Sequence, residues 1–243
     1  MPYSDITFQD KNPVKRWLQQ RRMVSATRLG KQSRQPAVIC DYGAGNGELC
    51  KQLAEQLPEA KFICYEPSPA FLEEAKENLI AVPNTEFYQD IQQIPLGTVD
   101  LLFCLEVFEH LPEKETHEAL QTISKLLKPG GEVVIGVPVE VGIPALYKGI
   151  FRMTRRFGAY DASPKNVFLS VIGSPPQDRP RGEIEAGFGY HFPHTGFDYR
   201  EFSKTLVGYF DLKKVSTSPF HAPGTLLMPE VYFSLEKPGK AAA

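Results

Sequence analysis

A strand-like apolar run that leads directly into three alternating glycines constrains this chain more than any other feature. The run begins at Val38 and passes through Asp41, just before the turn, into Gly43, Gly45 and Gly47. Glycine is needed where the backbone adopts a positive φ or where a ligand must approach the main chain closely. A helical pattern begins directly after the last glycine. This order of strand, glycine turn and helix indicates a nucleotide-type binding site at the carboxyl edge of a parallel sheet.

The overall composition is that of a folded protein rather than a disordered one. The 243 residues are 42% hydrophobic and 23% charged, which is enough for one α/β domain with a full core. No stretch approaches the length of a membrane span, and residues 1–5 begin no secretory signal, so we expect a cytoplasmic protein. Cys40, Cys50, Cys64 and Cys104 form no C-x-x-C pair. This favours buried thiols in a reducing compartment over disulfides or zinc.

The charges are distributed unevenly along the chain. The net charge of −2 argues against a general nucleic-acid binder. Residues 11–34, however, contain eight basic residues and no acid, and residues 144–160 contain four more, again with no acid. We therefore expect a strongly dipolar molecule.

Strand-like and helical stretches alternate along most of the chain. We expect strands at 37–41, 61–66, 85–89, 100–104 and 132–137, and helices at 14–29, 48–57, 69–80 and 114–127. A helix at 199–207 and two strands at 210–215 and 231–236 follow later, the strands as an antiparallel hairpin that closes the sheet. Strict alternation with short connections predicts an α/β fold with a doubly wound, seven-stranded, mostly parallel sheet and an antiparallel last strand.

One long segment interrupts this alternation. Residues 139–196 contain scattered prolines and glycines and are too long for a plain loop. We expect a lid-like insertion on the substrate side, with one helix near 144–157 and a mobile segment near 173–190. The chain is then one domain with five parts: a basic N-terminal helical segment (1–35), a cofactor-binding core (36–138), this insertion (139–196), a C-terminal helix and hairpin (197–236) and a frayed tail (237–243).

Two acids end the second and third expected strands. Glu66, followed by Pro67, can accept hydrogen bonds from both hydroxyls of a ribose, and its alternative role is that of a solvated acid. Asp90, followed by Ile91, can bind an adenine amino group and ring nitrogen through its carboxylate and the next backbone N–H. The alternative for Asp90 is a helix N-cap, which uses the same atoms.

Two further motifs connect these features to a known family. They are Leu-Glu-Val-Phe-Glu-His-Leu-Pro at 105–112 and Leu-Lys-Pro-Gly-Gly at 127–131. With the glycine loop, Glu66 and Asp90, in this order and spacing across about 36–138, the chain resembles the class I S-adenosylmethionine-dependent methyltransferases. The resemblance is to the broad, type 11-like group that includes the ubiquinone-biosynthesis O-methyltransferases. NAD-dependent dehydrogenases share the glycine loop and the acid after the second strand, but not the later motifs.

The resemblance implies S-adenosyl-L-methionine as the cofactor, S-adenosyl-L-homocysteine as the product, and a set of cofactor-binding positions. Around the methionine part and the ribose it places Asp41, Gly43, Ala44, Gly45 and Gly47; beside the ribose, Glu66 and Pro67; beside the adenine, Asp90 and Ile91; and at the amino-acid portion and the mouth of the site, Leu105 and Glu106. It says little about the acceptor.

Three histidines are candidate catalytic bases. A sulfonium is already a strong electrophile, so the protein mainly aligns the nucleophile, and a base within hydrogen-bond reach helps an oxygen nucleophile further. His110 follows the fourth strand on the catalytic edge, and His191 and His194 lie where the insertion rejoins the core. The alternatives are a helix-start histidine at 110 and histidines that anchor the insertion through hydrogen bonds.

A metal ion is a less favoured use of the same region. Some quinone-pathway relatives resemble the Glu106-x-x-Glu109-His110 spacing and use it to hold a divalent cation. The spacing is widespread in relatives that are not known to need a metal, so we expect none here.

The helix expected in the insertion has an apolar face and a basic face. Ile143, Leu146, Tyr147, Ile150, Phe151 and Phe157 oppose Lys148, Arg152, Arg155 and Arg156 at helical spacing. It is either a lid packed on the core with its arginines in water, or a basic surface that, with residues 11–34, holds an anionic substrate or rests on an anionic membrane.

These expectations combine into one functional hypothesis and two alternatives. The hypothesis is methyl transfer from S-adenosylmethionine to a small-molecule or lipid-linked acceptor, in one version anionic, and on oxygen rather than on another atom. The first alternative is a catalytically silent, cofactor-binding interaction partner, and the second is an NAD(P)-dependent oxidoreductase.

Overall fold

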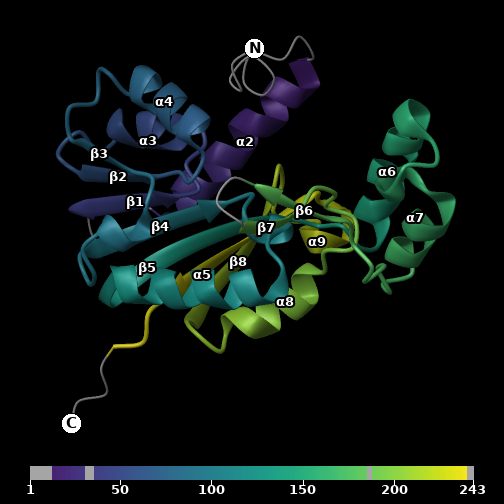
Figure 1. Ribbon diagram of the computed structural model, residues 1–243. Helices are drawn as coiled ribbons and strands as arrows, with labels where there is room; N and C mark the ends of the chain where they lie inside the picture. The colour runs from purple at the N-terminus through teal and green to yellow at the C-terminus, as the bar shows by residue number, and fades with distance from the viewer. Residues whose placement is uncertain (1–12, 31–35, 185–187, 240–243) are drawn as a thin grey trace.

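A seven-stranded sheet forms the centre of the computed structural model, which describes residues 13–30, 36–184 and 188–239 (Figure 1). Its strands are β1 (Val38–Tyr42), β2 (Lys61–Tyr65), β3 (Thr85–Tyr88), β4 (Val99–Leu105), β5 (Leu127–Pro138), β8 (Asp211–Ser218) and β9 (Glu230–Glu236). They lie in the order β3-β2-β1-β4-β5-β9-β8. All neighbours pair in parallel except β9, which runs antiparallel to both β5 and β8. The predicted fold class, including the antiparallel last strand, is confirmed.

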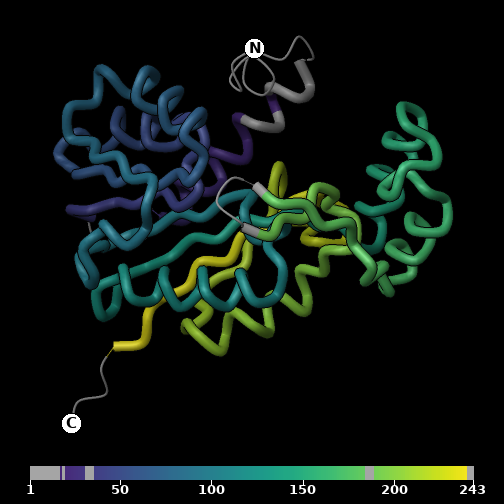
Figure 2. The backbone as a smooth tube through the Cα atoms, in the orientation of Figure 1, coloured from purple at the N-terminus to yellow at the C-terminus, as the bar shows by residue number. Residues whose placement is uncertain are grey.

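Helices cover both faces of the sheet, as Figures 1 and 2 show. They are α2 (Pro13–Gly30), α3 (Glu48–Ala54) and α4 (Pro69–Asn78) on one face, and α5 (Glu113–Leu126) and α8 (Tyr199–Leu206) on the other. Because side chains alternate along a strand, Ile39 packs with the first group of helices and Cys40 with the second. The four cysteines are buried free thiols, as expected.

The fifth strand is longer than predicted, because it includes the Lys-Pro-Gly-Gly motif instead of beginning after it. We expected residues 132–137, whereas β5 already begins at Leu127, which pairs with Val99. The register then shifts before Glu132 pairs with Leu101. Leu127 is fully buried, so the sheet gains an apolar anchor ahead of the glycines that the sequence pattern assigned to a turn.

The insertion contains more regular structure than we predicted. It carries α6 (Ile143–Arg156), which confirms the expected helix, and also the short 3₁₀ helix η3 (Tyr160–Ala162) and α7 (Pro164–Val171). The segment near 173–190, which we expected to be mobile, contains regular structure, because β6 (Arg181–Ile184) and β7 (Phe188–His191) form an antiparallel hairpin. The hairpin has a partner on the core: the ring of Tyr190 stacks on that of His110, with ring centroids 4.4 Å apart.

Two of the four basic residues of α6 point toward the core and pair with a carboxylate of the chain itself, rather than facing water or a bound anionic ligand. Lys148 and Arg152 form ion pairs with Glu140 at 3.0 Å and 2.8 Å, and Arg156 pairs with Asp161. Glu140 lies just after β5 and is 1% exposed. A buried carboxylate needs cationic partners, so it draws the basic side of the helix inward.

The C-terminal end of the described chain departs from expectation at one residue. Lys237 does not fray, because its backbone N–H bonds to the carbonyl of Gly131 at 2.8 Å and its ammonium to the carbonyl of Leu127. Residues 240–243 of the expected tail lie outside the described residues. So do Lys11, Lys31 and Arg34 of the basic N-terminal segment, together with the side chains of Lys15 and Arg16. Within the described ranges, no helix is both long enough and apolar enough to cross a membrane.

Candidate active site

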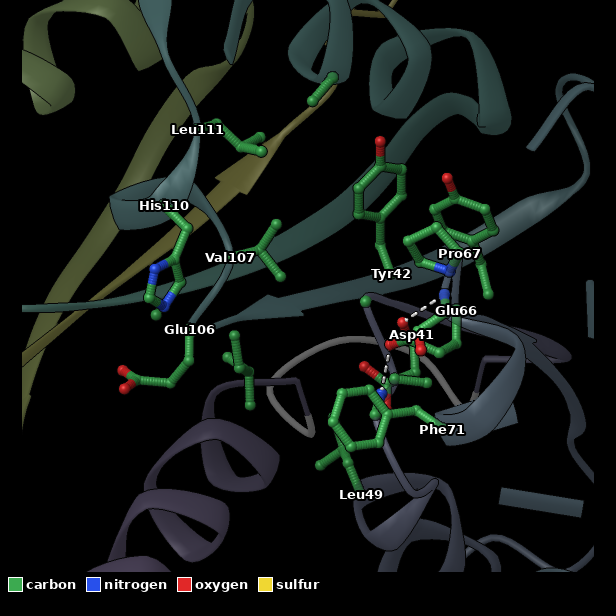
Figure 3. Close-up of a pocket in the computed structure, with 18 of the residues that line it drawn as sticks. Asp41, Tyr42, Leu49, Glu66, Pro67, Phe71, Glu106, Val107, His110 and Leu111 are labelled. Atoms are coloured by element: carbon green, nitrogen blue, oxygen red, sulfur yellow. Dashed lines mark hydrogen bonds between the residues drawn. The ribbon is translucent and has the colours of Figure 1, made fainter. Parts of the chain in front are cut away.

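A cavity of about 750 Å³ opens at the carboxyl ends of β1, β2 and β4. It is lined by the glycine loop, the turn after β2, the segment after β4, helix α2 and the strand β7. Figure 3 shows Asp41 and Glu66 on one side of this cavity and Glu106 and His110 on the other. This is the sheet edge at which open α/β sheets bind their ligands.

The glycine loop adopts the positive φ angles that its sequence predicted. The φ angles of Gly43, Gly45 and Gly47 are 80°, 54° and 74°. A Cβ at Gly43 would lie 2.5 Å from a methyl of Val107, whereas one at Gly45 would meet nothing within 4 Å. Gly45 therefore leaves the main chain open to a ligand. Gly47 does not line the cavity; it is the N-cap residue of α3, and a Cβ there would meet Leu79 at 2.7 Å.

Glu66 holds the glycine loop in place and still faces the cavity. One carboxylate oxygen accepts the N–H of Gly45 at 2.8 Å, and the other accepts that of Ser68 at 2.9 Å. Each oxygen has a second lone pair for a ribose hydroxyl. Asp41 lies beside it and is buried, and this burial, with the nearby Glu66 charge, raises the pKa of Asp41 to about 7. Pro67 and Ala44 also line the cavity.

Asp90 and Ile91 play different roles. Ile91 lines the cavity, but Asp90 does not. The Asp90 carboxylate accepts the backbone N–H of Gln92 at 2.9 Å and so caps the 3₁₀ helix η1 (Ile91–Gln93). In this structure the carboxylate thus has the capping partner that its alternative role required.

Leu105 and Glu106 lie where the cavity meets the N-terminal helix. Glu106 has a φ of 56°, the one positive value among the described residues other than glycine. Backbone strain of this kind is found mostly at functional sites. The Glu106 carboxylate faces Arg22 of α2 at 3.4 Å, and Arg22 also pairs with the buried Glu230 of β9. Helix α2 therefore forms part of the cavity wall.

The three candidate histidines meet at one point, but only two rings face the cavity. His110, in the 3₁₀ helix η2 (Phe108–His110), and His194 line it, with their Nε2 atoms 3.2 Å apart. His191 does not line it: its ring bonds to the carbonyl of Pro180 at 3.1 Å, which is the anchoring role given above as the alternative. Its own carbonyl is bonded to Nδ1 of His110 at 2.7 Å.

These contacts fix the hydrogen positions of the histidine pair. A carbonyl only accepts, so Nδ1 of His110 carries the proton, and Nε2 of the neutral ring is an acceptor. His194 must then donate from its own Nε2 to that of His110. Burial lowers the pKa of both rings, that of His194 to about 3. Both rings are therefore neutral at pH 7, and the lone pair of His110 lies at the cavity wall.

Glu109 is a buried acid next to this pair. It is fully buried, and neither carboxylate oxygen has a hydrogen-bond partner among the described residues. Burial raises the pKa of Glu109 well above its usual range. Ligand atoms of Glu109, His110 and His194 lie within 4.8 Å of one another, which is a donor set that a divalent transition metal accepts. Glu106 is not part of this group.

Several residues that line the cavity escaped the sequence interpretation. They are Arg22 and Met23 of α2, Tyr42 of β1, Phe71 of α4 and Tyr190 of β7. Tyr42 and Phe71 were accessible to sequence reasoning, because one lies between Asp41 and Gly43 and the other in the first turn after Glu66-Pro67. The other three depend on long-range packing.

Comparison with known proteins agrees with this geometry. Residues 40–133 match a family model described as a methyltransferase domain. A trans-aconitate 2-methyltransferase of Deinococcus radiodurans is 35% identical over 105 residues, which are 43% of this chain and 39% of that protein. An uncharacterized methyltransferase of Anoxybacillus flavithermus is 33% identical over 99 residues, which are 40% and 45%. The chain thus matches less than half the length of these relatives.

Solved structures match over nearly the whole chain. The N-methyltransferase NodS from Bradyrhizobium japonicum in complex with S-adenosyl-L-homocysteine superposes with a TM-score of 0.58 at 15% identity, over 94% of this chain and 90% of that one. The PH0226 protein from Pyrococcus horikoshii gives 0.65 at 12% identity, over 98% and 99%. At these identities the likeness shows the fold alone.

Residues 40–133 are a methyltransferase domain, and the fold built around them is that of the class I S-adenosylmethionine-dependent methyltransferases. The predicted family is confirmed for residues 40–133, and this match together with the neighbour in complex with S-adenosyl-L-homocysteine supports the predicted cofactor. The residues present fit that group, since the main chain at Gly45 is open and the Glu66 carboxylate lies beside it.

Proposed function

We propose that this protein transfers a methyl group from S-adenosylmethionine to a hydroxyl oxygen of a small-molecule or lipid-linked acceptor. One observation carries the proposal: a single cavity joins the open main chain at Gly45 and the carboxylate of Glu66 to the imidazole of His110. A donor site and a base therefore face the same space.

On the donor side of the cavity, the protein has to bind and orient S-adenosylmethionine. When bound, S-adenosylmethionine supplies a methyl group on a positively charged sulfur, which is reactive without further activation. Glu66 would accept from the ribose, the main chain of residues 43–45 would lie along the ligand, and Ile91 would flank the adenine. The strained Glu106, held by Arg22, would border the amino-acid end. Positioning of this kind supplies most of the rate enhancement that such a transfer needs.

On the acceptor side, His110 is the proposed base. Its Nδ1–H is fixed by the carbonyl of His191, so its Nε2 lone pair is available to a hydroxyl that takes the place of His194 as donor. The acceptor oxygen would pass its proton to Nε2 of His110 as its bond to the methyl carbon forms. Stacking on Tyr190 holds the ring plane.

The charges around the cavity favour a neutral acceptor over a polyanionic one. Arg22 is the one lysine or arginine that lines the cavity in the described part of the chain, and it is already paired with Glu106 and Glu230. Lys148 and Arg152, which could have held an anion, are used by Glu140. A tricarboxylate such as the one in the relatives' name would have no free cation to meet there.

Calorimetry and turnover together test the proposal. We expect S-adenosylhomocysteine to bind and NAD not to bind; binding of NAD alone would instead support an oxidoreductase. Turnover is then measured on neutral phenols and alcohols against carboxylates and amines. Binding of S-adenosylhomocysteine without turnover on any class would favour the catalytically silent partner.

The role of His110 is tested by His110→Asn, because an asparagine amide can still donate to the carbonyl of His191 but offers no Nε2. General-base catalysis predicts a loss of about 10²–10⁴ in kcat with S-adenosylhomocysteine affinity retained. His117→Asn is the matched control. His117 does not line the cavity, and its Nδ1 forms a 2.8 Å hydrogen bond with the hydroxyl of Tyr209. Equal kcat in both variants would exclude the base.

A metal-assisted route is a second candidate, and the unpartnered carboxylate of Glu109 favours it. Glu109, His110 and His194 would hold the ion, which would polarise the acceptor hydroxyl. Treatment with EDTA separates the two routes. Loss of turnover that a divalent cation restores supports the metal, whereas unchanged turnover supports His110 as base.

A further inference from the structure

The helix α6 presents its apolar side to solvent. Its exposed residues recur at helical spacing, so they form one stripe along the helix. The exposed fractions of Ile143, Leu146, Tyr147, Ile150 and Phe151 are 42%, 43%, 41%, 50% and 51%. We call this stripe the α6 face. Amphipathic helices of globular proteins normally bury such a stripe, so its exposure needs an explanation.

Buried charge keeps the helix in this orientation. On the opposite side of α6, Lys148 and Arg152 pair with Glu140, and Arg152 also donates to the hydroxyl of Thr195 at 2.9 Å. Close packing adds to this, because a Cβ at Gly149 would lie 2.5 Å from Val167 of α7. Rolling the helix to bury its apolar side would strand the Glu140 carboxylate without partners, which is costly in a protein interior. The α6 face therefore points outward in the folded chain.

The apolar surface continues onto a neighbouring element. The hydroxyl of Tyr147 donates to the carbonyl of Leu227 in α9 (Gly224–Leu227) at 3.1 Å. Leu226 and Leu227 are 66% and 42% exposed. Figure 1 shows α6 with α7 at the end of the molecule opposite α3 and α4. The surface is thus a protruding helix extended at one side by two leucines.

The charges beside the α6 face have one sign. Residues 141–177 contain five lysines and arginines and a single acid, Asp161, which is buried and paired with Arg156. Arg155 is exposed and lies over the ring of Phe151, with its guanidinium carbon 4.4 Å from the ring centroid. Lys165, at the start of α7, is exposed too. Cations that flank an apolar stripe complement the negative surface of anionic lipids.

From these observations we propose that the α6 face docks on an anionic lipid membrane, with its apolar side chains at the acyl boundary and Arg155 and Lys165 among the headgroups. A single protruding helix of this kind suits shallow immersion, in which the apolar side of an interfacial helix sinks about 5–10 Å. The proposal concerns attachment and does not depend on methyl transfer. The sequence suggested the basic faces of two helices as the membrane contact, whereas here the principal contact is the apolar α6 face.

Sedimentation of the full chain with vesicles tests this proposal. We expect binding to vesicles that contain phosphatidylglycerol, weaker binding to pure phosphatidylcholine, and a decline with added salt because exposed cations contribute. The double variant Leu146→Ser with Ile150→Ser should lower the binding constant about 30-fold, equivalent to ~2 kcal/mol. Each of these residues is about half exposed, and replacing it by serine removes the apolar surface that would move from water into the membrane.

A matched control removes apolar surface elsewhere. Ile80 and Leu96 are 87% and 66% exposed and lie outside the α6 face, so Ile80→Ser with Leu96→Ser should bind vesicles as the parent chain does. Binding of S-adenosylhomocysteine and circular dichroism check that each variant is folded. The proposal fails if the parent chain does not sediment with anionic vesicles, or if both double variants lose binding equally. It also fails if sedimentation velocity shows a dimer that only the Leu146 and Ile150 variant dissociates, without vesicle binding, since the face would then be a protein interface.

Discussion

Two glycines of the same loop should respond differently to the same substitution. Gly43 and Gly45 both have positive φ angles, 80° and 54°, so alanine is strained at either position. Only at Gly43 does the added Cβ meet a neighbour, the Val107 methyl at 2.5 Å, while at Gly45 it would enter open space in the cavity. Gly43→Ala should therefore act mainly on stability, and Gly45→Ala mainly on the ligand.

The magnitudes follow from these two contributions. Left-handed backbone costs an alanine about 1–2 kcal/mol, which applies to both variants. Overpacking adds about 1–3 kcal/mol at Gly43 alone, because 2.5 Å is well inside van der Waals contact. We thus expect Gly43→Ala to lower the free energy of unfolding by roughly 2–5 kcal/mol and Gly45→Ala by about 1–2 kcal/mol. The methyl at Gly45 occupies space needed by the ligand and should weaken S-adenosylhomocysteine binding at least tenfold, or ~1.4 kcal/mol.

Urea unfolding gives the stabilities, and calorimetry with S-adenosylhomocysteine gives the affinities. Adding Val107→Ala to Gly43→Ala removes the methyl that the new Cβ would meet, so a double-mutant cycle should show a favourable coupling of about 1–3 kcal/mol. Equal stability losses in the two single variants, or unchanged affinity in Gly45→Ala, would refute the assignment of Gly45 as the open side of the loop.

Substitution of two carboxylates, those of Glu66 and Glu140, leads to further quantitative predictions. Glu66→Gln should weaken S-adenosylhomocysteine binding about 10- to 100-fold, because hydrogen bonds to a charged acceptor contribute about 1.5–3 kcal/mol; isothermal calorimetry measures this, and a change below twofold would contradict the ribose role. Glu140→Gln should lower the free energy of unfolding at pH 7 by about 3–5 kcal/mol, since it removes the buried charge that Lys148 and Arg152 share and leaves Arg152 only a longer ionic contact with Asp161 at 3.7 Å. Although burial alone would raise the pKa of Glu140, Lys148, Arg152 and more weakly His194 hold it well below its usual range. Stability from this pairing is present above the unfolded pKa of 4.5 and is lost as the pH falls further, so urea midpoints of the two proteins should converge in acid.

The meeting of the glycine loop and Glu66 at one cavity could be predicted from the sequence. The glycine loop and Glu66 are set by local turn chemistry and by the fact that parallel strands end at one edge. Asp90 shows the limit of that reasoning, since an adenine ligand and a helix cap require the same carboxylate at the same place. Only the position of the residue relative to the cavity distinguishes the two roles.

The orientation of α6 could not be predicted, for a different reason. Helical periodicity shows that Ile150 and Arg152 lie on opposite sides, but it does not say which side is outside. The decision rests on Glu140, which follows β5 and is buried there. Because an isolated buried carboxylate is far costlier than exposed apolar carbon, the basic side turned inward. The pairing of β6 with β7 was not predicted either, because the core residue that the hairpin contacts, His110, is distant in sequence.

The division of the cavity also explains why the relatives do not identify the acceptor. The family model ends at residue 133 and covers the glycine loop, Glu66 and His110. The rest of the acceptor wall comes from outside it: Arg22 from α2, and Tyr190 and His194 from the insertion. On the proposed function, a match that ends at residue 133 includes the donor side of the cavity and omits these residues of the acceptor side. A shared core is therefore compatible with different acceptors, because Arg22, Tyr190 and His194 of the present cavity all lie outside the residues that match the family model.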